Sequence, residues 1–125
     1  MSAAGVGATP FLRRFPALED RLPHTAIGAY PTPLRVLQEL PRALGAASPP
    51  SALYLKDDGL SSPLYGGNKV RKLELVLGEA LRRGAREVMT FGFAGSNHAA
   101  ATAVHAASVG LRSISMLLPQ ANAPY

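Results

Sequence analysis

The sequence predicts an α/β fold built on a parallel sheet with right-handed crossovers, and three observations support this prediction. Apolar residues recur at helical spacing over residues 69–84, and an Ala-rich segment covers residues 96–109. A short apolar run follows each of these segments, at residues 87–93 and 111–118. Helix, strand, helix and strand with short connections are typical of parallel strands joined by crossovers. Third, 47% hydrophobic and 17% charged residues in a 125-residue chain indicate a globular protein with a single core.

The first half of the chain is rich in proline and predicts few regular elements. Residues 30–34, YPTPL, are expected to be extended, because proline disfavours the helical conformation of the residue before it. We expect one short helix over residues 34–44, kinked at Pro41 and ended by Gly45. A loop over residues 45–52 then leads to a short strand over residues 53–56, which ends in the turn Asp-Asp-Gly.

The second half contains the clearest elements. The helix over residues 69–84 has an apolar face and ends at Gly84, and Asn68 is a candidate N-cap. Its apolar positions are Val70, Leu73, Val76, Leu77, Ala80 and Leu81. The Ala-rich helix ends at Gly110 and leads into the second apolar strand.

Two parallel strands are too few to form a stable sheet that helices cover on both faces. We therefore expect the chain to be the N-terminal fragment of a larger protein. In this interpretation residues 1–85 carry the helix that begins near Lys69, and residues 86–125 begin a small α/β domain.

Composition excludes several functions. The chain has no Cys, and its three His are not closely paired, so we expect no metal site. The net charge of +5 is concentrated between residues 69 and 86 without interleaved aromatic residues, which favours an anionic ligand over nucleic acid. Residues 88–111 carry no charge, but the polar cluster at 95–98 argues against a membrane span. No secretory signal is recognisable, so a cytoplasmic location is expected.

The segment GGNKVRKLE, residues 66–74, is the first candidate functional motif. Gly66 and Gly67 permit a close backbone approach or a positive φ directly before a helix. Lys69 lies in the first helical turn, where the helix dipole and the like charge of Lys72 disfavour a charged amine and favour a nucleophilic one. Such an amine suits a carbonyl cofactor such as pyridoxal phosphate. A solvent-exposed lysine without function is the alternative, and the residues by themselves favour it.

The segment GFAGSNH, residues 92–98, is the second candidate motif. It comes directly after a parallel strand, at the edge where open α/β sheets bind ligands, and free N–H groups at the start of the next helix attract anions. Asn97 and His98 could serve an anionic oxygen, whereas Ser96 is equally explained as an ordinary N-cap. His105 is more typical of a hydrogen-bonded core residue.

The order and spacing of four motifs resemble the family of pyridoxal-phosphate (PLP) enzymes that contains 1-aminocyclopropane-1-carboxylate (ACC) deaminase and D-cysteine desulfhydrase. The motifs are YPTPL, LYLKDD, GGNKVRKLE and GSNH, and the match spans about residues 28–120. The resemblance implies the tryptophan-synthase β type of fold, in which two α/β domains enclose the cofactor. It further implies a lyase or deaminase that acts on a small amino acid and forms a homo-oligomer.

The resemblance also implies roles for individual residues. Lys69 matches the lysine that forms a Schiff base with PLP, and Asn97 matches the residue that hydrogen-bonds the phenolic oxygen of the cofactor. Lys72 matches a position facing the phosphate. Ser96 matches the group that meets the substrate carboxylate or assists proton movement, and His98 would support these groups.

The substrate and the activity of the chain stay open on the sequence alone. Gly95 replaces a glutamine common in these enzymes, and alanines follow His98 where bulkier polar residues are usual. A non-catalytic module that binds an anion or a cofactor, or an inactive truncated product, are the alternatives.

Overall fold

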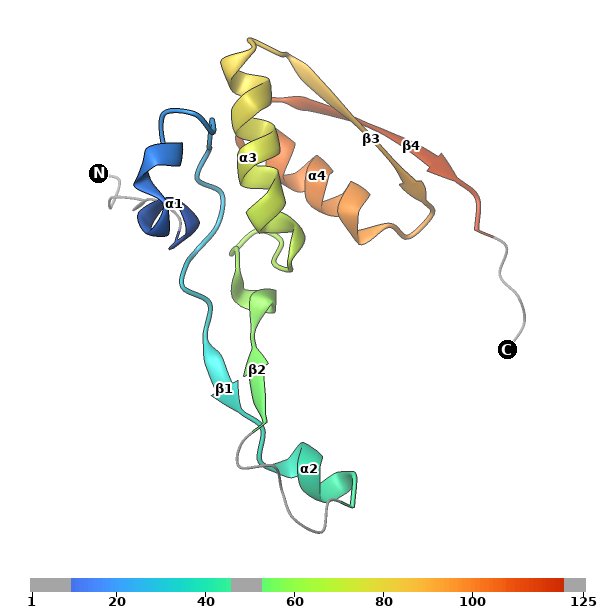
Figure 1. Ribbon diagram of the computed structural model, residues 1–125. Coiled ribbons are helices and arrows are strands. Elements are labelled where there is room, and N and C mark those ends of the chain that lie inside the picture. The colour runs from blue at the N-terminus through green and yellow to red at the C-terminus, as the bar shows by residue number, and fades with distance from the viewer. Residues whose placement is uncertain (1–9, 46–52, 121–125) are drawn as a thin grey trace.

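The computed structural model describes residues 10–45 and 53–120 and contains two separate two-stranded sheets (Figure 1). Its first half comprises five short elements: α1 (Pro10–Arg14), the 3₁₀ helix η1 (Pro16–Leu18), β1 (Leu34–Val36), α2 (Glu39–Ala43) and β2 (Tyr54–Lys56). The second half comprises the 3₁₀ helix η2 (Asp58–Leu60), α3 (Lys69–Arg82), β3 (Glu87–Phe93), α4 (Asn97–Ser108) and β4 (Arg112–Leu118).

β1 and β2 form an antiparallel arm that extends away from α3 and α4, with α2 at its far end (Figure 1). Leu34 lies opposite Lys56 and Val36 opposite Tyr54. The expected helix over residues 34–44 is therefore wrong in its first half. Pairing with a strand that lies far along the chain overrides the local pattern, which does not reveal this partner. Of the expected loop, residues 46–52 lie outside the described residues.

β3 and β4 are parallel and in register from Glu87 opposite Arg112 to Phe93 opposite Leu118. α4 connects them and packs against both strands, and α3 packs against α4. The core joins these elements and consists of Leu73, Leu77, Ala101, Ala106 and Leu111. The predicted parallel α/β unit is thus confirmed, with strand and helix bounds within two residues of those expected.

The start of α3 differs in one detail from the expectation. Asn68 occupies the N-cap position, but its backbone is already helical and its side chain makes no capping hydrogen bond. The amide of Val70 instead bonds the carbonyl oxygen of Gly67 at 3.3 Å, so the preceding loop supplies the first acceptor. Ser96, by contrast, caps α4 as expected, because its hydroxyl accepts from the amide of Ala99 at 3.3 Å.

Residues 24–28 form a strap that crosses α3. The amide of Thr25 bonds the carbonyl oxygen of Glu74 at 3.0 Å, and the buried carboxylate of Glu74 accepts from the amide of Gly28 at 2.9 Å. The crossing is close at Gly78, where an added Cβ would lie 2.6 Å from the Cα of His24. The strap can approach α3 this closely because Gly78 has no side chain.

The face of the β3–β4 sheet that points away from α4 is apolar, and none of the described elements covers it. Register places Met89, Phe91 and Phe93 opposite Ile114, Met116 and Leu118. The exposed fraction of Phe91 is 71%, and that of Leu118 is 62%. Among the described residues, no helix is long and apolar enough to cross a bilayer. The division of the chain at residue 85 stays a prediction, although α3 and α4 contribute to one core across it.

Candidate functional site

The loop before α3 brings its backbone unusually close to η2, and its two glycines serve different purposes. A Cβ at Gly66 would lie 1.8 Å from the carbonyl oxygen of Gly59, so only glycine fits there. Gly67 has a φ of +109°, a conformation that residues with a side chain rarely adopt. Both expectations for this pair, a close approach and a positive φ, are confirmed. The loop delivers Lys69 to the first position of α3.

Lys69 lines an open hollow of about 300 Å³ together with Asn97, the first residue of α4. Its other lining residues are Gly59, Tyr65, Gly66, Gly67 and Asn68. The hollow lies between the start of α3 and the start of α4, and its volume is at the lower end for a small-molecule site, about 300 to 1,000 Å³. Two residues that the sequence singled out from separate motifs therefore share one cavity.

Tyr65 is a member of this site that sequence reasoning missed. Its hydroxyl donates to Oδ1 of Asn97 at 3.1 Å, and its carbonyl oxygen contacts Nε2 of the buried His105 at 2.9 Å. The prediction that His105 is a hydrogen-bonded core residue is thereby confirmed. Its position directly before the two glycines could have drawn attention to Tyr65, but nothing in the sequence indicated that Asn97 is its partner.

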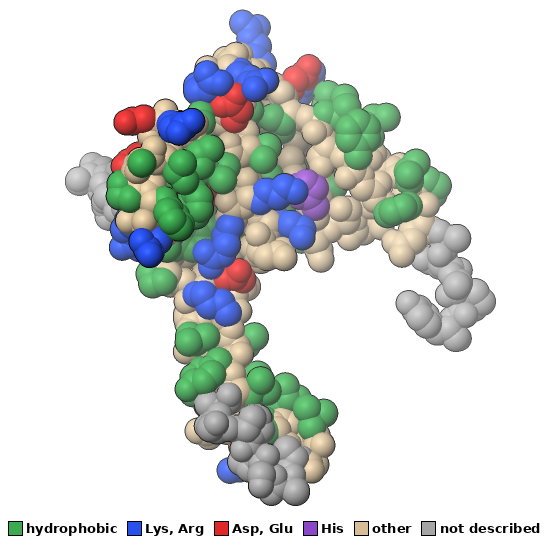
Figure 2. Space-filling view, viewed as in Figure 1, with side chains coloured by type: hydrophobic (Ala, Val, Ile, Leu, Met, Phe, Trp, Pro, Cys, Tyr) green, Lys and Arg blue, Asp and Glu red, His purple; other side chains and the backbone are tan. Residues whose placement is uncertain are grey.

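The remaining predicted residues lie around the hollow and do not line it. The hydroxyl of Ser96 is engaged in capping α4. Burial, followed by the positive charges of Lys72 and Lys69, lowers the pKa of His98 below its ordinary value of 6.5. His98 is therefore predominantly neutral at pH 7, near two cations. Figure 2 shows Lys and Arg side chains gathered around a His side chain in the middle of the body.

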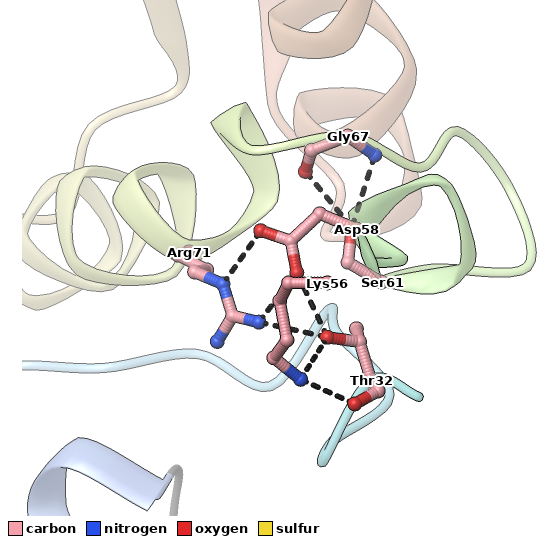
Figure 3. Close-up of polar contacts among 6 residues, drawn as sticks. All are labelled: Thr32, Lys56, Asp58, Ser61, Gly67 and Arg71. Carbon is pink, nitrogen blue, oxygen red and sulfur yellow. Dashed lines mark hydrogen bonds and ion pairs between the residues drawn. The ribbon is translucent and has the colours of Figure 1, made fainter. Parts of the chain in front are cut away.

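A polar cluster anchors the loop that carries Lys69 (Figure 3). Arg71 donates to Asp58 twice, from Nε to Oδ2 at 3.1 Å and from Nη2 to Oδ1 at 2.7 Å. Thr32 also donates to Asp58 Oδ1, at 2.8 Å, and accepts from Nη2 of Arg71 and Nζ of Lys56. The cluster thus connects the segment before β1, the end of β2, η2 and α3.

The same cluster reaches the backbone of Gly67. The carbonyl oxygen of Asp58 accepts from the amide of Gly67 at 2.7 Å. Ser61, which is fully buried, donates from its hydroxyl to the carbonyl oxygen of Gly67 at 2.8 Å and accepts from its amide at 3.0 Å. These contacts fix the conformation of the loop two residues before Lys69.

Electrostatics strengthens this anchor. Hydrogen bonds from Arg71 and then from Thr32 lower the pKa of Asp58 from 3.8 to about 2, so its carboxylate is charged at neutral pH. The guanidinium of Arg71 lies 4.6 Å from the ring centroid of Tyr30. Burial, followed by the nearby charge of Glu74, raises the pKa of Tyr30 to about 12, so the phenol stays neutral.

The site combines a lysine amine, an amide side chain and nearby positive charge, which are the groups expected in a class of protein that binds an anionic carbonyl compound. The family of pyridoxal-phosphate dependent enzymes matches residues 26–124. The chain belongs to this family.

Two relatives and one solved structure extend this result. The chain is 42% identical over 106 residues to a D-cysteine desulfhydrase of Salmonella paratyphi B, which covers 85% of this chain and 29% of that protein. It is 51% identical over 71 residues to the nocardicin C-9' epimerase of Nocardia uniformis subsp. tsuyamanensis, which covers 57% of this chain and 22% of the relative. A crystal structure of an ACC deaminase homologue superposes with a TM-score of 0.69 at 40% identity, over 81% of this chain and 30% of the other.

These comparisons confirm the resemblance and the fold class inferred from the four motifs. The chain spans less than a third of the length of the relatives it matches. The roles assigned to Lys69, Lys72, Ser96, Asn97 and His98 stay predictions.

Proposed function

We propose that this chain provides the cofactor-binding lysine of a PLP-dependent lyase or deaminase that acts on a small amino acid. The observation that carries the proposal is the shared hollow, in which Lys69 and Asn97 meet from two helix starts. The names of the relatives support the reaction class, since one is a D-cysteine desulfhydrase and one an ACC deaminase homologue. Homo-oligomer formation and a cytoplasmic location stay predictions.

The residues present fit pyridoxal phosphate. Lys69 offers the amine that a carbonyl group requires, and Asn97 offers an amide N–H for an anionic oxygen. Lys72 and the free N–H groups at the start of α4 attract negative charge to the same region. Bound pyridoxal phosphate supplies an electron sink next to the Cα of an amino acid.

Lys69 is also the group to which we assign proton transfer, because it lines the hollow. As an amine, its Nζ would take a proton from the Cα of an amino acid bound there. Ser96, adjacent to Asn97, is the second group near the start of α4, and we propose that it meets the substrate carboxylate. This role requires its hydroxyl to accept the capping bond and donate to the substrate at the same time.

Epimerisation of an amino-acid centre is a second candidate reaction. The match to the nocardicin C-9' epimerase, 51% identical over 71 residues, favours it specifically. We assign Lys69 the same proton-transfer role in both reactions, which differ in their products. Assays of the complete gene product with D-cysteine, ACC and chiral amino acids separate them by their products: hydrogen sulfide from D-cysteine, ammonia from ACC, or the opposite enantiomer of a chiral amino acid.

The covalent role of Lys69 is tested by borohydride reduction of the complete gene product with PLP, followed by peptide mass mapping. We expect one pyridoxyl group, on Lys69, and none in Lys69→Ala. The internal control is Lys56, a lysine on β2 outside the hollow, which should carry no pyridoxyl group in wild type or in Lys69→Ala. A pyridoxyl group on another lysine, or on none, rules the assignment out.

A further inference from the structure

We infer that Tyr65 is a positioning residue, which fixes the side-chain amide of Asn97 so that its N–H groups face the ligand in the hollow. The inference rests on the proposed function. It starts from the bond between the Tyr65 hydroxyl and Oδ1 of Asn97, 3.1 Å long, at the edge of that hollow.

An asparagine amide presents either an acceptor or two donors, depending on which way it is turned. The phenol of Tyr65 donates to the oxygen, so the nitrogen is the atom left for other partners. An N–H donor stabilises an anionic oxygen, whereas the opposite orientation would direct a carbonyl dipole at it. Without the hydroxyl, the amide of Asn97 loses the contact that distinguishes the two orientations.

Tyr65 is itself held in place, as a positioning residue must be. Nε2 of His105 contacts its carbonyl oxygen at 2.9 Å, and a carbonyl oxygen only accepts, so this nitrogen carries the hydrogen. His105 is completely buried and lies two turns along α4 from Asn97. Tyr65 is also partly buried and packs against the core. Tyr65 therefore contacts α4 at two places, its hydroxyl near the start and its backbone further along.

Tyr65→Phe tests the inference because it removes one oxygen and keeps the ring and the backbone contact to His105. Tyr54→Phe is the matched control, since Tyr54 is an exposed tyrosine on β2, away from the hollow. The affinity of the complete gene product for PLP is measured by absorbance titration in wild type, both variants, Asn97→Ala and the double variant Tyr65→Phe/Asn97→Ala. Thermal unfolding is measured for each.

We expect Tyr65→Phe to weaken PLP binding about 3- to 10-fold, as for one hydrogen bond, and to shift the absorbance maximum of the bound cofactor. Tyr54→Phe should bind as wild type. In the Asn97→Ala background the same change at Tyr65 should have no further effect, because Tyr65 acts through Asn97.

Two results would overturn the inference: unchanged affinity in Tyr65→Phe, whether or not its melting temperature falls, or an equal loss of affinity in both backgrounds. Failure of the proposed function looks different. In that case wild type itself yields no pyridoxyl group on Lys69 after borohydride reduction. If Lys69 is labelled and Asn97→Ala binds PLP weakly, the proposed function holds, and the affinity of Tyr65→Phe then tests the role of Tyr65 alone.

Discussion

At the scale of single residues, Asn97 is a side chain that we expect to contribute to binding and little to stability. Its side chain is exposed, and the hydrogen bond it makes with Tyr65 also lies at the surface. We predict that Asn97→Ala in the complete gene product weakens PLP binding by about 1.5 to 3 kcal/mol, the value of a hydrogen bond to a charged oxygen. The melting temperature without PLP should stay close to that of wild type. Titration and thermal unfolding check both, and early melting with native affinity would contradict the role.

His98 provides a pH-dependent prediction. Burial and the charges of Lys72 and Lys69 lower its pKa, so the charged form is destabilised in the folded protein. The stability from neutral His98 is present above pH 6.5 and declines as the pH falls through the lowered pKa. We predict an NMR titration midpoint below 6.5, raised by Lys72→Met and unaffected by Arg86→Met. A midpoint that does not respond to Lys72→Met would contradict the contribution of the Lys72 charge.

The residues that could be predicted from sequence are those with a local signature. Lys69 comes after two glycines at a helix start, and Asn97 comes after a strand, so each has a motif of its own. Tyr65 and Asp58 have none, because their roles depend on partners 32 and 13 positions away. LYLKDD contributes to the resemblance as a whole motif, without indicating a role for any single residue in it.

At the scale of elements, the ion pair between Arg71 and Asp58 holds α3 against η2 and thereby holds the loop before Lys69. Both side chains are largely covered, with exposed fractions of 38% and 26%. Asp58 connects to three chain segments, whereas the exposed pair Arg42–Glu39 lies within one short helix. We therefore expect the two ion pairs to differ greatly in their contribution to stability.

We predict that Asp58→Asn destabilises the protein by about 1 to 3 kcal/mol, because Arg71 loses its charged partner. Glu39→Gln should change stability by less than about 1 kcal/mol, as is typical of surface pairs. The lowered pKa of Asp58 means that its contribution is complete above pH 3.8 and is lost as the pH falls toward about 2. Denaturant unfolding of wild type and the two variants at pH 7 and pH 2.5 measures the stability changes and their pH dependence. Equal effects of the two variants would contradict the anchor.

Elements whose apolar residues recur at regular spacing could be predicted from the sequence. Elements that depend on pairing with a distant segment of the chain could not. Leu73 and Leu77 recur at helical spacing and are buried in α3, as the pattern requires. The three residues of β1 are equally compatible with the start of a helix on their sequence alone. Only its pairing with Tyr54–Lys56 makes it a strand, and residue spacing carries no information on that pairing.

At the scale of the whole molecule, the uncovered face of the β3–β4 sheet is the dominant feature. Apolar side chains on both strands are exposed there, notably Phe91, Phe93, Met116 and Leu118. A groove of about 500 Å³ lies among them. Contiguous apolar surface of this kind favours association, and no further strand among residues 10–45 and 53–120 pairs with either edge of the sheet.

We predict that the 125-residue chain, expressed by itself, is marginally stable, lacks lyase or deaminase activity and self-associates with increasing concentration. Phe91→Lys should reduce the association. Leu44→Lys should not, because Leu44 is equally exposed but lies at the end of α2, away from the β3–β4 sheet. Size exclusion, thermal melting and product assays check this. A monomer that melts cooperatively and turns over substrate would show that the exposed face is tolerated.

The strap across α3 reverses the usual outcome of a helix substitution. Replacing glycine by alanine inside a helix normally gains about 1 kcal/mol in helix formation. At Gly78 the new methyl group would lie 2.6 Å from the backbone of His24, and backbone atoms cannot move aside as a flexible side chain can. The strap would have to lift, and the bonds from Thr25 and Gly28 to Glu74 would break with it. At this position Gly78→Ala would therefore raise the helix propensity of α3 and lower the stability of the folded protein.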